Sequence, residues 1–233
     1  MTQTLISQNL RENNRPAHDL AESQEFQRQL MAGSLPREEY VAFLEQSLLI
    51  HQALEQAMPA VHGALPETVA MLTDQQVHSA RIEADLQILT GSPANTAPTA
   101  MKSTAEFLGH IRAFAASRPV VLLGIWYVLE GSKNGGKFLA RAVEKAYGLE
   151  PRVGSSYMDP YGSDQQTIWR AFKETLDGLP LADDQRRMVE MAANHTFLAV
   201  TNLCREIVGE EPLALAPAKA GGCPHAARGA AGH

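Results

Sequence analysis

Apolar side chains recur every three or four residues along nearly the whole chain, which is the repeat of an amphipathic α-helix. Strand signals are missing, because no Asn-Gly or Asp-Gly pair lies between alternating apolar runs and no strand–helix–strand rhythm is visible. A chain with this pattern buries its apolar surface between packed helices. We therefore expect an all-α protein.

Turn residues divide this pattern into helical segments. A first helix is expected over about residues 16–32, with Pro16 in its first turn and Gly33 at its end. The next helix is expected to run to about Met58, where Pro59 breaks it. The remaining segments are expected at about 66–72, 74–90, 103–117, 119–147, 164–178 and 182–208.

The length and the distribution of residue types predict one helical domain followed by a tail. The chain has 233 residues, which at roughly 100–200 residues per domain favours a single domain. From Glu210 onward Pro, Ala and Gly dominate, and such a segment has too little apolar bulk to fold alone. We expect a helical domain over residues 1–209 and a flexible tail over residues 210–233.

Charge and cysteine content exclude several kinds of partner. The net charge of −6 argues against nucleic acid, which favours a basic surface. No apolar run approaches the roughly 18–20 residues of a membrane span, and no secretory signal is visible, so we expect a cytoplasmic protein without a membrane partner. The two cysteines, Cys204 and Cys223, carry no Cys-x-x-Cys spacing, which argues against a thiolate zinc or iron–sulfur site.

Among the eight histidines, His18 is the first candidate metal ligand, although its spacing alone is a weak signal. It lies four residues before Glu22, so the two side chains share a helix face. Neutral imidazole binds iron or zinc, and a nearby carboxylate can fix the tautomer of the ring. On spacing alone, an ordinary exposed ion pair is the better explanation. Other pairs at helical spacing are also candidate metal ligands or solvated faces: His51/Glu55, Asp74/His78 and Glu106/His110. His195, on the apolar stripe of the last helix, is interpreted as a hydrogen-bonded core residue, with a pocket role second.

A glycine cluster interrupts the apolar pattern of residues 119–147. Each glycine in a helix costs about 0.5–1 kcal/mol of stability relative to alanine. This cost applies to Gly131, Gly135 and Gly136, so a structural or functional reason for the cluster is expected. Gly131 and Gly135 share one face, where a flat ligand can lie against the backbone. Close helix packing is an alternative. A phosphate loop fits less well, because Phe138 stands where the motif requires Ser or Thr.

Together these segments resemble the heme oxygenase family in its bacterial form. The resemblance rests on His18 to Glu55, on Trp126 to Gly136, and on Trp169 to Phe172 with the last helix, and it covers about residues 4–209. It implies a single-domain helical bundle that holds heme between a proximal N-terminal helix and a kinked, glycine-rich distal helix.

The resemblance also implies roles for the histidine and the glycines. His18 would be the iron ligand and Glu22 its partner. Gly131, Gly135 and Gly136 would line the distal face of the heme, with Gly131 and Gly135 in the catalytic set.

Further implied roles fall on polar residues. Ser132 joins the catalytic set because it stands where mammalian-type relatives have an aspartate, so that Ser132, Asn134 or held water would supply protons. The pair Lys133-Asn134 makes the segment more polar than the family usually has. Arg11, with Lys173 or Arg170, would bind the heme propionates.

The activity implied by the resemblance is oxygen-dependent cleavage of heme b to biliverdin, carbon monoxide and ferrous iron. Heme would be substrate and cofactor, and a ferredoxin or a reductase would supply electrons. Three alternatives stay open: a heme carrier or sensor without turnover, a non-heme di-iron oxidase of the same fold, and a structural helical module. Ser132 and the Cys223-Pro224 dipeptide, which could bind heme through its thiolate or be part of a plain tail, motivate the carrier.

Overall fold

The computed structural model describes residues 4–214, and within this range helices and loops are present but no strand. The expected all-α fold is therefore confirmed. The α-helices are α1 (Ile6–Asn13), α2 (Arg15–Glu22), α3 (Glu25–Ala32), α4 (Arg37–Ala64), α5 (Ser79–Thr90), α6 (Lys102–Ser117), α7 (Leu123–Tyr147), α8 (Gln165–Gly178) and α9 (Asp183–Ile207). Short 3₁₀ turns are η1 (Pro66–Ala70), η2 (Asp74–Gln76), η3 (Pro119–Leu122) and η4 (Gly162–Asp164).

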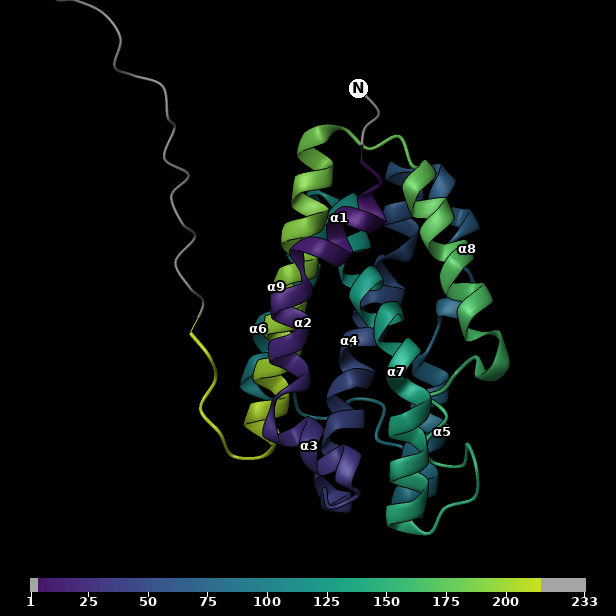
Figure 1. The fold of residues 1–233 in the computed structure, drawn as a ribbon, viewed down its shortest axis with the longest axis vertical. Coiled ribbons are helices and arrows are strands. Elements are labelled where there is room, and N and C mark those ends of the chain that lie inside the picture. Colours follow the sequence, from purple (N-terminus) through teal and green to yellow (C-terminus); the bar gives the residue numbers. More distant parts are fainter. Residues whose placement is uncertain (1–3, 215–233) are drawn as a thin grey trace, which may run out of the picture.

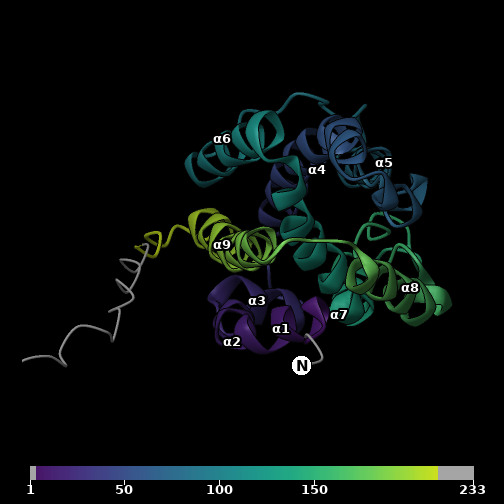
Figure 2. The ribbon, with the colours of Figure 1, turned by 90° about the horizontal axis from the view of Figure 1, so that it is seen from above.

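Helices α7 and α9 lie in the middle of the molecule and cross in close contact. Seen from above, α4, α5 and α6 lie on one side of this pair, and α1, α2 and α3 lie on the other (Figure 2). Gly124 makes the crossing possible, because a Cβ atom there would lie 2.1 Å from the carbonyl oxygen of Val189. Any larger residue at this position would force the two helices apart.

The N-terminal region differs from the single helix expected over residues 16–32. Gln24 has extended backbone dihedrals, and its side-chain amide donates to the carbonyl of Leu20 at 2.7 Å. The break separates α2, which packs on α9, from α3, which packs on both α7 and α9. A further helix, α1, precedes them (Figure 1).

Helix α4 continues through Pro59 to Ala64, so the expected break at Pro59 is wrong. Proline removes one backbone hydrogen bond and crowds the preceding turn, a cost of about 3 kcal/mol. Continuing the helix places Val61 in the core with no exposed surface. Burial of this side chain, at about 1.5–3 kcal/mol, offsets much of that cost.

The chain after α9 folds back on that helix as far as it is described. The Asn202 side chain accepts from the backbone N–H of Leu213 at 2.7 Å and donates to its carbonyl at 3.1 Å. The first residues beyond the expected boundary at 209 are thus tied to the helical body. The Cys223-Pro224 dipeptide lies outside the described residues. No helix in residues 4–214 combines the length and the apolar character needed to cross a bilayer.

Candidate active site

Helix α2 presents His18 as a half-exposed imidazole. Pro16 lies in its first turn, and the Arg15 guanidinium pairs with Asp19 at 3.0 Å on the exposed surface. The His18 side chain is 49% exposed, and its ring meets Phe197 of α9 in an edge-to-face contact with 5.7 Å between centroids. One aromatic contact thus orients a ring that is otherwise accessible. Phe197 was missed by the sequence analysis because it looks like any apolar residue of the last helix.

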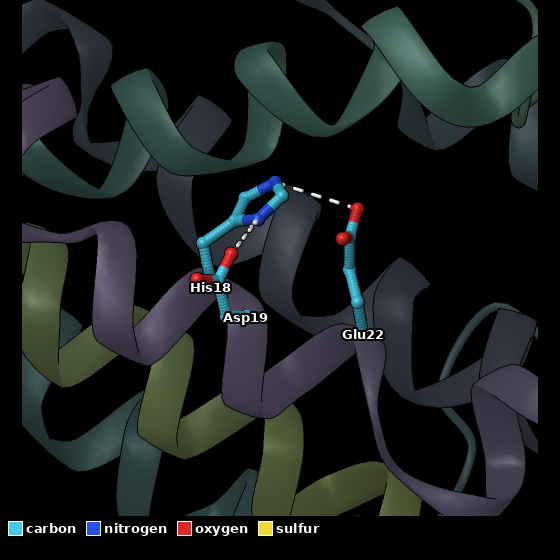
Figure 3. Close-up of side chains that lie close together, drawn as sticks. All are labelled: His18, Asp19 and Glu22. Carbon is cyan, nitrogen blue, oxygen red and sulfur yellow. Dashed lines mark ion pairs between the residues drawn. The ribbon is translucent and has the colours of Figure 1, made fainter.

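Two carboxylates flank the His18 ring. Its Nε2 lies 3.6 Å from Glu22 Oε1 and its Nδ1 lies 3.7 Å from Asp19 Oδ1 (Figure 3). Both distances exceed those of a hydrogen bond, so the carboxylates surround the ring without a direct bond to either nitrogen. The ligand atoms of the three side chains lie within 4.8 Å of one another, close enough to hold a metal ion. The His18–Glu22 relationship expected from the spacing is present in this loose form.

The glycines of α7 fall on two different faces of one uninterrupted helix. Around Gly135 no atom lies within 4 Å of an added Cβ, whereas an added Cβ on Gly131 would touch the Trp169 ring at 3.4 Å. Gly136 lies elsewhere, since a Cβ there would be 1.9 Å from the carbonyl oxygen of Met158. Gly135 therefore exposes bare backbone and Gly131 lies against the Trp169 ring, while Gly136 admits the loop that follows α7.

Side chains within the glycine segment bond back to the helix. Ser132 Oγ donates to the carbonyl of Leu129 at 2.7 Å, and Asn134 Nδ2 donates to the carbonyl of Gly131 at 2.8 Å. Such back-bonding to the preceding turn makes a helix easier to bend. Phe138, one turn after Gly135, is 56% exposed, which is unusual for a large apolar side chain.

Two of the expected cations gather near one pair of aromatic rings. Tyr127 and Trp169 lie 5.2 Å apart between centroids, and Lys173 Nζ lies 5.5 Å from the Trp169 ring. Burial raises the pKa of Tyr127 to about 12, and the positive charge of nearby Arg11 opposes that rise. The structure therefore brings Arg11 and Lys173 to the side of α7 where Gly131 meets Trp169. Arg170 is exposed on α8.

Four other histidines form a buried pair, His51 and His78, and a less buried pair, His110 and His195. His78 Nε2 lies 2.9 Å from Glu130 Oε1, and His51 Nε2 lies 3.0 Å from the Tyr157 hydroxyl, all within the protein. The view of His51 and His78 as solvated residues is wrong, because the helix pattern did not show what packs over them. His195 is only partly buried; its ring meets that of His110 at 4.5 Å, and burial, with a smaller contribution from His110, lowers its pKa.

The histidine pairs that were candidate metal ligands form no carboxylate-rich metal centre in the part of the chain that the structure describes. Within residues 4–214, the group of three or more ligand atoms close enough for one ion is His18, Asp19 and Glu22, all exposed. The Glu55 carboxylate accepts from the backbone N–H of His78 at 2.8 Å. It is thus engaged in holding the start of α5.

The fold and the site define an all-α protein in which a histidine-bearing helix and a glycine-bearing helix share α9 as their support. A family model described as heme oxygenase matches residues 4–206, and the chain belongs to the heme oxygenase family, a family of enzymes. Heme oxygenase from Rhodella violacea is 19% identical over 206 residues, which span 88% of this chain and 87% of that protein.

Solved structures show the same fold. Heme oxygenase from Leptospira interrogans has a TM-score of 0.79 at 23% identity, covering 87% of this chain and all 100% of that one. Heme oxygenase-1 from the cyanobacterium Synechocystis, in complex with heme, has a TM-score of 0.80 at 19% identity, covering 88% of this chain and 93% of that one. The resemblance drawn from the sequence is thereby confirmed.

Proposed function

We propose that this enzyme cleaves heme with dioxygen to biliverdin, carbon monoxide and ferrous iron, with His18 as the iron ligand. The observation that carries the proposal is the half-exposed His18 ring on α2, which contacts Phe197 of α9. Helix α9 also packs against α7, the helix that carries the open Gly135. Membership of the heme oxygenase family supports the same activity.

The residues around this site fit the shape and charge of heme. A flat macrocycle needs a face with little side-chain bulk, which Gly135 provides, while Gly131 leaves room for the Trp169 ring beside it. Apolar contact would come from Phe138 and Trp169. The propionates would pair with Arg11 and Lys173, and Arg170 of α8 is a further cation for them. Glu22 beside the ring would stabilise its orientation.

Bound heme would supply the iron at which oxygen is activated, while the protein would determine which meso carbon is attacked and would supply protons. The bare backbone at Gly135 would leave room for a small gas molecule. The Ser132 hydroxyl donates its hydrogen bond to the carbonyl of Leu129, so its oxygen remains free to accept a hydrogen bond from water. Water held between Ser132 and Asn134 would deliver protons in place of the aspartate of mammalian-type relatives. Electrons would come from a ferredoxin or a reductase.

The decisive test compares His18→Ala with His110→Ala, which removes an exposed histidine on α6. Hemin is titrated into each protein, and ascorbate or ferredoxin is added in air. We expect the wild type and His110→Ala to give a histidine-ligated spectrum and biliverdin, and His18→Ala to give neither. An unchanged spectrum and turnover in His18→Ala would contradict the assignment.

The same experiment tests the second candidate function, a heme carrier or sensor, which is favoured by Ser132 at the distal position. In that case the wild type binds hemin through His18 but its heme absorption persists under reductant and oxygen. Formation of biliverdin excludes this alternative.

A further inference from the structure

The face of α7 opposite Gly131 and Gly135 packs on a buried polar cluster that the proposed reaction does not use. Its members come from α4, from the start of α5, from α7 and from the loop after α7. We call it the back cluster: His51, His78, Glu130, Lys133, Tyr157 and Tyr161.

Lys133 is the unusual member of the back cluster. Its side chain is 3% exposed, and its Nζ lies 3.2 Å from the centre of the Tyr157 ring. Buried lysines are rare, and a desolvated ammonium over an aromatic face is worth about 2 kcal/mol or more. The contact therefore ties α7 to the loop directly behind the glycine segment.

Tyr157 is itself held from two sides. Its hydroxyl lies 3.0 Å from His51 Nε2, and its backbone N–H donates to Asp85 Oδ2 at 2.7 Å. The next residue, Met158, places its carbonyl oxygen against Gly136. A displacement of Tyr157 thus moves the backbone atom that presses on α7 beside Gly135.

Charged and titratable groups face Lys133 from each element around it. They are Glu130 on α7, Arg81 and Asp85 on α5, His78 before α5, His51 on α4, and Tyr157 and Tyr161 in the loop. Burial lowers the pKa of Lys133 to about 7, and Arg81 adds to that effect while Glu130 and Asp85 oppose it. The amine thus changes its charge near neutral pH.

We propose that Lys133 is a positioning residue for the glycine segment. It acts through Tyr157 and Met158 and determines where Gly131 and Gly135 lie. The ammonium is attracted to the face of the Tyr157 ring, and the neutral amine is not. Protonation tightens the loop on Gly136, and deprotonation relaxes it. The effect on heme rests on the proposed function, whereas the movement of the segment does not.

Trp169 reports this movement in the heme-free, full-length protein because Gly131 lies against its ring. The measurement is tryptophan emission from pH 5.5 to 9, with Trp169→Phe separating the signal of Trp169 from that of the deeply buried Trp126. We expect the wild type to show a transition of Trp169 emission with a midpoint near pH 7, and Lys133→Met to lose it.

Two variants of the ring partner test the route through Tyr157. Tyr157→Phe keeps the aromatic face and is expected to keep the transition, whereas Tyr157→Leu removes the face and is expected to lose it. A wild type without a transition of Trp169 emission between pH 6 and 8 overturns the proposal without any variant. Superimposable curves for the wild type and Lys133→Met also overturn it.

Hemin affinity across the same pH range then links the positioning residue to the site. We expect hemin affinity to change at least threefold across the transition in the wild type and to stay constant in Lys133→Met. If the emission transition depends on Lys133 but hemin does not bind at all, the proposed function fails and the positioning role stands. If hemin binds through His18 with the same pH profile in both proteins, the proposed function stands and the positioning role for heme fails.

Discussion

Gly135 and Gly136 are neighbours in sequence with opposite surroundings, since a Cβ meets nothing within 4 Å at the first and the carbonyl oxygen of Met158 at 1.9 Å at the second. We predict that Gly136→Ala destabilises the heme-free protein by about 1–3 kcal/mol, the usual cost of overpacking. Gly135→Ala should instead raise its stability by about 0.5–1 kcal/mol through the better helix propensity of alanine. Urea unfolding measures both.

For Gly135→Ala, the effect on hemin binding should be opposite to the effect on stability. Gly135→Ala adds a methyl group to the face proposed for heme, so its hemin affinity or biliverdin yield should fall although the fold is more stable. If Gly135→Ala binds and cleaves hemin as the wild type does, this face of α7 does not contact heme.

The crossing of α7 and α9 gives a second prediction. Gly124→Ala places a methyl group 2.1 Å from the carbonyl oxygen of Val189, so we expect a loss of at least about 1–3 kcal/mol in the free energy of unfolding. Gly109→Ala is the matched control, because an added Cβ on this α6 residue meets nothing within 4 Å. Equal thermal midpoints for the two variants would contradict the close crossing.

Stability against pH gives a third prediction. The pKa of Lys133 is about 7 in the folded protein and about 10.4 in an unfolded chain, so the unfolded state binds more protons between these values. Stability contributed by this group therefore rises with pH across that window. Lys133→Met should flatten this rise, by an amount on the order of 4 kcal/mol between pH 7 and 10. Urea unfolding at several pH values, wild type against variant, measures the difference.

The cations near Tyr127 and Trp169 give a fourth prediction. Arg11→Ala and Lys173→Ala should each weaken hemin affinity by roughly three- to tenfold, since a tenfold loss corresponds to about 1.4 kcal/mol. Lys145→Ala, an exposed cation in the last turn of α7, is the control. A shift in the biliverdin isomer would show that the two cations also orient the macrocycle. Affinities equal to that of the control would remove both from the site.

Periodicity predicted most of the fold because each helix shows its buried face in the spacing of its own apolar residues. It could not predict that Pro59 lies within α4 or that the chain breaks at Gln24, since both depend on what the next turn packs against. The same limit applies to the site. The glycine segment could be found from the sequence pattern and His18 from the family resemblance, but nothing in the sequence distinguishes the open Gly135 from the packed Gly136.

The family resemblance predicted the role of His18, whereas the roles of Phe197 and Lys133 could be inferred only from three-dimensional contacts. Phe197 lies 179 positions along the chain from the ring that it orients. Lys133 reads as a solvated lysine in a polar stretch, and only the loop folded over it shows that it is buried.

Helix α9 supports Phe197 beneath His18 and meets α7 at Gly124. The absence of a side chain at Gly124 therefore sets the distance between α7 and α9, and through α9 the position of α7 relative to α2. A methyl group added there, distant in sequence from His18, would therefore change the separation of the two helices between which heme is proposed to bind.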